Sequence, residues 1–313
     1  MHRDFAQDIR KNKRDSTLML GTLFVVMVLL GWVFGEAYGY PLWGVLLGVV
    51  VAVTMVLSAY YDGARRILEY NWAFEATKDT HPLLVNVVDE MRIAAGLPMP
   101  KVFVIESEAM NAFATGRDPE HAVVAVTHGL LENLNREELQ AVVGHEISHI
   151  YNFDIRYMMV VAATVGAVVL LSDGFLGSAR YGGLSLSKRR KNFGPMAVLA
   201  IALAIFAPIF AMFLQMAISR DREYLADASA ARFTRNPLAL ASALEKIDFN
   251  VINKPLPSAN RATQHLYIVN PLRSIGMASS ELMSTHPPTE ERVRRLRQMG
   301  AMNESRWVGD EIK

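Results

Sequence analysis

The chain has 313 residues, of which 51% are hydrophobic and only 20% are charged, and its mean hydropathy is +0.18. Soluble domains carry about a quarter charged residues, so this shortage of charge indicates contact with a membrane. The absence of cysteine excludes disulfides, thiol nucleophiles and thiolate metal ligands. A net charge of +1, from 32 basic and 31 acidic residues, argues against a nucleic-acid partner.

Two long uncharged stretches lie near the start of the chain. Ser16 to Gly35 has 20 residues without a charged side chain, and Ala37 to Tyr61 has 25. About 20 apolar residues span a bilayer as a helix, so both stretches qualify. Glu36 alone separates them, beside glycine and proline, so we predict a transmembrane hairpin. The first stretch exceeds the roughly 7–15 apolar residues of a signal-peptide core, and we expect an uncleaved anchor.

The positive charges around the hairpin indicate its orientation. A basic tail precedes the first stretch, and Arg65 and Arg66 follow the second, whereas the turn between them has no lysine or arginine. The positive-inside rule therefore places the N-terminus and everything after Tyr61 in the cytoplasm.

The segments between and after the apolar stretches have the patterns of an ordinary α+β domain. Helical spacing and capping residues predict helices, and β-branched runs predict short strands. Asn135 with Glu138 three residues later resembles a capping box. The expected helices are Pro82–Ala95, Asn135–Ile150, Leu238–Ile247 and one beginning at Thr289, and the expected strands are Val102–Ile105 and Ala122–Val126.

Two further apolar segments allow more than one interpretation. Tyr157 to Ser172 has 16 uncharged residues, short for a membrane span, and a buried core helix is the alternative. Asn192 to Ser219 has 28, with a proline in its middle. The loop between the segments is basic. Either the positive-inside rule is broken there, or the segments enter the membrane without crossing it.

The motif that indicates chemistry is His145-Glu146-Ile147-Ser148-His149. Residues four apart project from one face of a helix, so the two imidazoles can bind one zinc ion. Glu146 lies between them, in reach of a water on that metal. The alternative is a polar helix face with two unrelated histidines. It fits poorly, because the motif lies in a well-capped helix with apolar neighbours.

A hydrolytic zinc site needs a third protein ligand and one open position. Without cysteine, this ligand is a histidine, an aspartate or a glutamate, and the best candidate is Glu223. Asp227 lies one helical turn later on the same face, where it can accept the N–H of a ligand histidine and fix its tautomer. A solvated charged helix is the alternative that spacing alone leaves open.

These motifs together resemble the HtpX-type membrane zinc metalloproteases, which are related more distantly to the type-I CAAX prenyl proteases. Besides the two helices, three strings carry the resemblance over nearly the whole chain. They are Asn111-Ala112-Phe113-Ala114, the string from His265 to Leu272, and Ser284-Thr285-His286-Pro287-Pro288-Thr289-Glu290-Glu291-Arg292. The region 173–195 is the least similar to the family.

The resemblance implies a role for each matching residue. His145, His149 and Glu223 correspond to the ligands of one zinc ion per chain, and Glu146 corresponds to the general base. Asp227 corresponds to a partner of a ligand. His286 is expected near the open metal position, where it stabilises the oxyanion, or else packed at a helix start. The implied substrate strand is Asn111, Ala112, Phe113 and Ala114, which pairs with an extended peptide, and a plain turn there is the alternative.

Two geometric expectations concern the membrane. The two ligand helices must lie on the same side, so the chain between His149 and Glu223 crosses the bilayer either twice or not at all. Tyr157 follows His149 by only eight residues, and a continuous helix would place the metal about 12 Å from the start of that apolar segment. We therefore expect a cytoplasmic site close to the bilayer surface.

We predict a mainly α membrane protein, with an α+β zincin-like metalloprotease domain, a small sheet and an N-terminal transmembrane hairpin. The expected divisions are 1–61, 62–156, 157–219 and 220–313, with the protease domain in the second and fourth. The resemblance implies a multi-pass protein of a prokaryotic inner membrane that cleaves membrane or misfolded proteins in quality control and the stress response. The alternatives are a non-catalytic zinc-binding membrane protein and an intramembrane-cleaving metalloprotease.

Overall fold

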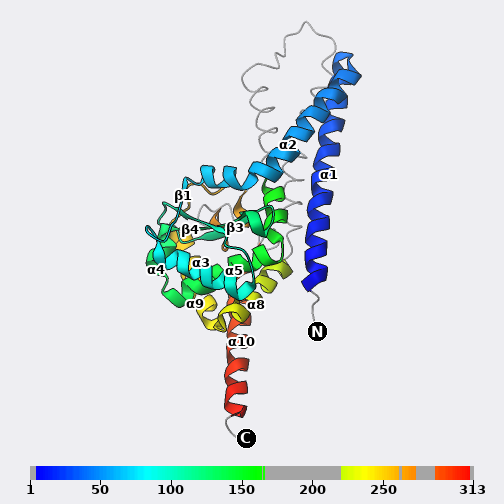
Figure 1. Ribbon diagram of the computed structural model, residues 1–313. Helices are drawn as coiled ribbons and strands as arrows, with labels where there is room; N and C mark the ends of the chain where they lie inside the picture. The colour runs from blue at the N-terminus through cyan, green and yellow to red at the C-terminus, as the bar shows by residue number, and fades with distance from the viewer. Residues whose placement is uncertain (1–4, 164, 166–219, 261–262, 273–285, 311–313) are drawn as a thin grey trace.

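The computed structural model describes residues 5–163, 165, 220–260, 263–272 and 286–310. These residues form a mostly helical protein with one small mixed sheet, and two long N-terminal helices stand beside the rounded main body (Figure 1). Most of the second half of the predicted segment 157–172, the whole of the predicted segment 192–219 and the basic loop between them lie outside the described residues.

The two N-terminal helices form an antiparallel pair. Helix α1 (Phe5–Tyr38) and helix α2 (Pro41–Tyr70) are joined at Gly39 and Tyr40. Helix α1 continues past Glu36, and the turn follows at Gly39, one of the expected turn residues. Gly39 has φ of +80°, a conformation that only glycine adopts at little cost. Among the described residues, one helix, α2, is long and apolar enough to cross a membrane. It also continues nine residues beyond Tyr61, to the sheet.

Glycines allow α1 and α2 to approach closely. Each helix has two glycines four residues apart, Gly31 and Gly35 in α1 and Gly44 and Gly48 in α2. A Cβ atom added to Gly31 would lie 2.7 Å from the Cα of Gly48, and one added to Gly35 would lie 2.8 Å from the Cα of Gly44. Backbones therefore touch where side chains would hold them apart, which is how small residues pack helices in lipid.

The sheet has the strand order β1-β2-β4-β3. Strand β2 (Lys101–Ile105) is parallel to β4 (Ala122–Thr127) and antiparallel to β1 (Ala73–Glu75), while β3 (Ala112–Gly116) is antiparallel to β4 at the other edge. The two strands predicted from sequence are confirmed to within a residue at each end. Strand β1 was not predicted, because three residues give no clear alternation. The strand that the resemblance implied at Asn111–Ala114 overlaps β3.

A separate hydrophobic cluster covers each face of the sheet. The larger cluster joins the sheet to α3 (Pro82–Ala95), α5 (Arg136–Tyr151) and α9 (Pro237–Asn253), with buried side chains such as Val88, Val126 and Leu244. On the other face, Ile67 and Leu68 of α2 pack with Phe113 and Ala125. The end of α2 thus forms a layer of the protein body (Figure 1).

Helix α5 runs through the middle of the larger cluster. Its capping box is confirmed: Glu138 N–H donates to Asn135 Oδ1, and Asn135 N–H donates to Glu138 Oε2, both at 2.9 Å. Every residue from Ala141 to Ile150 is buried. The short helix α4 (His128–Asn133) precedes it, and α8 (Arg220–Thr234) packs against it.

The helix predicted over Asn135–Ile150 is confirmed to within a residue at each end, so the chain is not one continuous helix from His149 to Tyr157. Helix α5 ends at Tyr151, and Asn152 and Phe153 form a turn before the next helix begins at Asp154. Phe153 has φ of 60°, which is incompatible with a continuous helix. The described start of the apolar segment, Tyr157 to Ala162, is helical and buried. Helix α10 (Thr289–Asp310) completes the described chain, with its predicted start confirmed.

The glycine contact between α1 and α2 leads to a stability prediction. Gly44→Ala would place its Cβ 2.5 Å from the Cα of Gly35, so the helices must separate. Overpacking of this kind costs about 1–3 kcal/mol, and we expect a lower thermal unfolding midpoint in detergent. The control is Gly21→Ala in α1, whose Cβ would meet nothing within 4 Å. Equal midpoints for the two variants would show that the close approach contributes nothing.

Candidate metal centre

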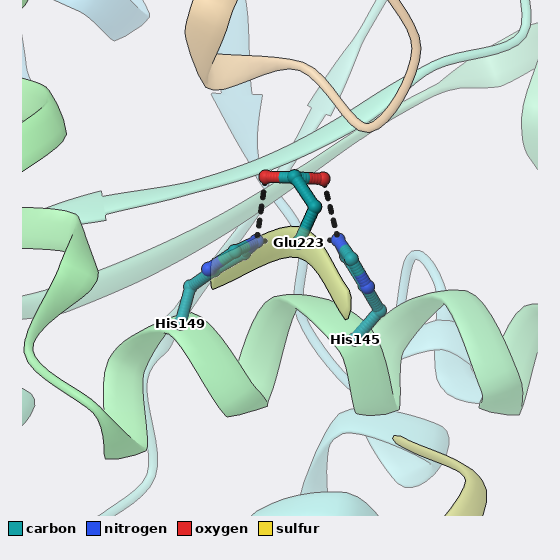
Figure 2. Close-up of side chains that lie close together, drawn as sticks. All are labelled: His145, His149 and Glu223. Carbon is teal, nitrogen blue, oxygen red and sulfur yellow. Dashed lines mark hydrogen bonds and ion pairs between the residues drawn. The ribbon is translucent and has the colours of Figure 1, made fainter. Parts of the chain in front are cut away.

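Three ligand-type side chains meet at the centre of the larger cluster. His145 and His149 project from one face of α5, and Glu223 reaches them from α8 (Figure 2). All three are buried, and their ligand atoms lie within 4.8 Å of one another. We call these residues the ligand trio.

The spacing of the trio fits a metal ion. The two Nε2 atoms are 3.2 Å apart, and the oxygens of Glu223 lie 3.7 Å from His145 Nε2 and 3.6 Å from His149 Nε2. Tetrahedral ligands about 2.1 Å from a zinc ion are separated by about 3.4 Å. The two nitrogens and the two Glu223 oxygens have nearly this separation, so the three residues fit a metal ion.

Each imidazole is oriented by a carboxylate on its other nitrogen. His145 Nδ1 lies 3.0 Å from Asp227 Oδ1, and His149 Nδ1 lies 3.1 Å from Asp154 Oδ2. Such partners fix the tautomer that leaves Nε2 free to coordinate a metal. Asp227 was expected in this position. Asp154 was not expected here, although it follows His149 by only five residues.

A buried arginine holds the Asp227 carboxylate in place. Arg292 of α10 donates from Nε to Asp227 Oδ2 at 2.9 Å and from Nη2 to Asp227 Oδ1 at 2.7 Å. Its Nη1 donates to Ile268 O at 2.8 Å and lies 3.6 Å from Glu223 Oε2. Arg292 lies in one of the strings that carried the family resemblance, but the sequence alone gave it no role.

Burial and neighbouring charges change the pKa values of these groups in different directions. Burial lowers the pKa of His145. For His149 burial has the same effect, but the hydrogen bond to Asp154 and the charge of Glu223 outweigh it and raise the pKa to about 9. A metal ligand is a neutral imidazole, so metal binding at His149 releases a proton.

Glu146 lies beside the trio and is 1% exposed. Burial, together with the like charge of Glu223, raises the pKa of Glu146 to about 7, although His149 and the backbone N–H of Ala114 oppose this. Its Oε2 makes no hydrogen bond with any other described residue. A carboxylate with a pKa near neutrality can both accept and return a proton.

His286 also reaches the trio. It precedes α10 and is 6% exposed, with Nδ1 lying 3.4 Å from Glu223 Oε2. Burial works against the charged form of Glu223, but His286, His149 and Arg292 together hold its pKa well below the usual range. The structure thus brings His286 next to a ligand-type carboxylate, and its expected contact with a reacting oxygen stays a prediction.

The expected substrate strand lies next to the trio, but part of its edge is paired with a later segment of the same chain. Ala112 O accepts from Ile268 N–H at 3.0 Å, and Phe113 forms a β-bridge with Tyr267. Asn111 Nδ2 donates to Val269 O at 2.9 Å. The late segment, residues 265–272, therefore covers the start of β3, and Ala114 faces Glu146.

These features define a class of enzyme. A buried HExxH helix supplies two oriented imidazoles and a carboxylate of raised pKa, and a glutamate from a second helix completes the trio. This is the donor set of a metallohydrolase with two histidine ligands and one glutamate ligand.

Comparison with known proteins shows the family. Residues 78–300 match the model of Peptidase family M48, and the chain belongs to this family. It is 45% identical over 307 residues to the protease HtpX homolog of Dictyoglomus turgidum, covering 97% of this chain and 96% of that protein. It is 44% identical to the protease HtpX homolog of Thermococcus kodakarensis, covering 90% and 96%. The protein is thus a membrane metalloprotease.

A solved structure shows the same fold at low sequence identity. The crystal structure of S. mikatae Ste24p matches with a TM-score of 0.51 and 21% identity, covering 92% of this chain and 66% of that one. The chain therefore spans just under two thirds of the length of that protein.

The buried arginine gives a prediction about stability. Arg292→Leu would leave Asp227 as an uncompensated buried charge, and breaking a buried pair in this way costs about 3–5 kcal/mol. We expect a large fall in the thermal unfolding midpoint, partly restored in the double variant Arg292→Leu/Asp227→Asn.

The control is Arg295→Leu in the same helix. Arg295 is 43% exposed and pairs with Glu291 at the surface, and such pairs contribute at most about 1 kcal/mol. Equal effects of the two single variants would contradict the assignment.

Proposed function

We propose that the chain is a zinc endopeptidase in which His145, His149 and Glu223 hold one Zn²⁺ and Glu146 is the general base. The observation that supports this most strongly is the convergence of the two Nε2 atoms and the Glu223 carboxylate within 4.8 Å. The carboxylates on both Nδ1 atoms add to it, because they present the free nitrogens to the metal.

The residues around the trio then have distinct roles in peptide hydrolysis. Bound zinc supplies Lewis acidity toward the scissile carbonyl and lowers the pKa of water. Glu146 takes the proton of the attacking water at its carboxylate and later gives it to the leaving amine. The backbone N–H of Ala114 orients that carboxylate. His286 stabilises the oxyanion from the side of Glu223.

We propose that an extended substrate binds at the Ala114 end of β3, by addition of a strand to the sheet edge. Asn111, Ala112 and Phe113 contribute by holding the late segment beside the site, since their contacts are with Tyr267, Ile268 and Val269. The zincin-like organisation that we propose consists of α5 beneath this sheet, with the edge strand β3 alongside the reacting groups.

We further propose that α1 and α2 form a transmembrane hairpin of a multi-pass protein and that the metal centre faces the cytoplasm. Asn12, near the start of α1, contacts the turn after α5, which supports a position of the N-terminus and the trio on the same side. The protease domain then consists of residues 62–156 and 220–313, with 157–219 inserted between them. Because α2 continues to Tyr70, the anchor of residues 1–61 joins the domain without a linker.

The assignment of Glu146 is tested by Glu146→Gln. The amide cannot accept the proton, and general-base catalysis contributes about 10²–10⁴-fold. We therefore expect cleavage of casein to fall by at least about 100-fold while the purified protein still contains one zinc ion. The control is Glu137→Gln, an exposed glutamate of the same helix. Removal of zinc with a chelator should abolish cleavage by the unmodified protein, and added zinc should restore it. Normal cleavage by Glu146→Gln would show that Glu146 is not the general base.

The proposed substrates are membrane or misfolded proteins, in quality control of a prokaryotic inner membrane. A site beside the bilayer suits segments that protrude from it. The inactive Glu146→Gln protein should retain such substrates on purification from cells, and mass spectrometry identifies them. A retained set made only of folded soluble proteins would contradict this substrate class.

The absence of cysteine makes the topology easy to test, since every introduced thiol is the only one. We expect Tyr40→Cys, in the exposed turn between α1 and α2, to react with a membrane-impermeant maleimide in intact cells. Lys78→Cys, at the surface of the protease domain, should react only after the membrane is opened. Labelling of Lys78→Cys in intact cells would place the domain outside.

A further inference from the structure

The start of the first N-terminal helix is tied to the metal centre. Asn12 of α1 is only 4% exposed. Its Nδ2 donates to Asn152 O at 2.9 Å and to Asp154 Oδ1 at 2.6 Å. An amide nitrogen has two hydrogens, so Asn12 uses both of them on the turn that follows the HExxH helix.

The carboxylate that Asn12 contacts is the one that orients a metal ligand. Asp154 is 1% exposed, and its other oxygen, Oδ2, lies 3.1 Å from His149 Nδ1. With one oxygen held by an amide and the other by an imidazole, the carboxylate plane is fixed, and the plane of the His149 ring follows it. Arg222 Nε lies 3.9 Å from Oδ1, too far for a hydrogen bond.

Each imidazole of the trio is therefore oriented by a buried aspartate, and each aspartate is held by a side chain from another helix. Asp227, the partner of His145, is clamped by Arg292 from α10. Asp154, the partner of His149, is held by Asn12 from the helix that leads into the proposed membrane hairpin. One ligand is oriented from within the protease domain and the other from its anchor.

Neighbouring contacts show that this end of α1 is docked as a unit. Lys13 Nζ lies 4.0 Å from the centre of the Phe153 ring, a cation–π contact. Ser16 is 1% exposed, and its Oγ donates to Asn12 O at 2.7 Å. The contact surface thus runs along one face of α1 up to the first residue of the uncharged stretch.

We propose that Asn12 is a positioning residue of the metal centre, through which the membrane anchor controls the orientation of His149 and the affinity for the metal. The proposal rests on the proposed zinc site. Any displacement of α1 from the turn at Asn152–Asp154 frees the Asp154 carboxylate and weakens metal binding. The enzyme is then fully loaded with metal only when its anchor is in place.

The test measures metal binding by the full-length protein in detergent. Zinc affinity is measured by competition with a chromogenic chelator, and the visible spectrum of the Co²⁺-substituted protein reports the coordination geometry. We expect Asn12→Ala to weaken zinc binding by about 3–10-fold, less than the 10–100-fold typical for loss of a direct partner of a ligand. The Co²⁺ absorption bands should shift as well.

Two further variants separate positioning from general stability. Asn12→Leu keeps the branched shape of the side chain, removes both N–H donors and favours the helix, so it should show a similar loss of affinity without leaving a cavity. Thr17→Ala is the control, because the exposed Thr17 hydroxyl has Lys13 O of the same helix as its hydrogen-bond partner among the described residues. It should leave affinity and spectrum unchanged.

A double-mutant cycle completes the test. In an Asp154→Asn background, Asn12→Ala should have little further effect on zinc affinity, because the two residues act as one unit. Equal effects in both backgrounds, or an unchanged affinity and Co²⁺ spectrum in Asn12→Ala and Asn12→Leu, would overturn the proposal. If the unmodified protein itself bound no zinc, the proposed function would fail instead.

Discussion

Compensation of buried negative charge is the constraint on which the arrangement around α5 depends. Glu146, Asp154, Glu223 and Asp227 are each at most 3% exposed. A buried carboxylate costs several kcal/mol unless opposite charge or hydrogen bonds compensate it. The compensating groups come from different helices, with Arg292 on α10, His149 on α5 and Asn12 on α1. The positions of these helices are thus set by the electrostatics of the site as well as by packing.

The stability of the fold comes mainly from elsewhere. The two hydrophobic clusters on the faces of the sheet bury aliphatic side chains from α2, α3, α5 and α9, and each fully buried side chain contributes roughly 1.5–3 kcal/mol. A buried ionic network is often no more stable than apolar residues of the same volume. The charged groups around the trio therefore maintain the geometry of the metal centre. Their burial lowers the stability of the fold, and the hydrophobic clusters offset this loss.

The sequence predicted the parts of the site that depend on local spacing. His145 and His149 belong to one helix, and the i, i+4 rule brings them together without any knowledge of the fold. Glu223 and Asp227 were selected by residue type and by their own i, i+4 spacing, and their place beside the histidines comes from the packing of α8 on α5. Long or well-capped elements such as α3 and α5 were also predictable.

Contacts between distant parts of the chain were not predictable. The Asn12–Asp154 hydrogen bond joins residues 142 positions apart, and neither residue type is unusual in its local sequence. The turn at Phe153 was missed, because an aromatic residue with positive φ has no sequence signature. Strand β3 is buried throughout, and the late segment covers its start. A fully buried short run cannot be told from other apolar segments by periodicity, so only the family resemblance indicated a strand there.

The uninterrupted course of α2 has a consequence for where the enzyme works. The helix passes from the turn at Gly39–Tyr40 to the sheet without a break, and Asn71 just beyond it accepts the hydroxyl hydrogens of Tyr267 and Ser258 at 2.6 Å. Nine residues separate Tyr61 from the end of α2 at Tyr70, which corresponds to about 14 Å of helix. In the proposed membrane arrangement, the anchor therefore holds the cleavage site at a fixed distance from the lipid. A peptide must extend that far from the bilayer before it can be cut.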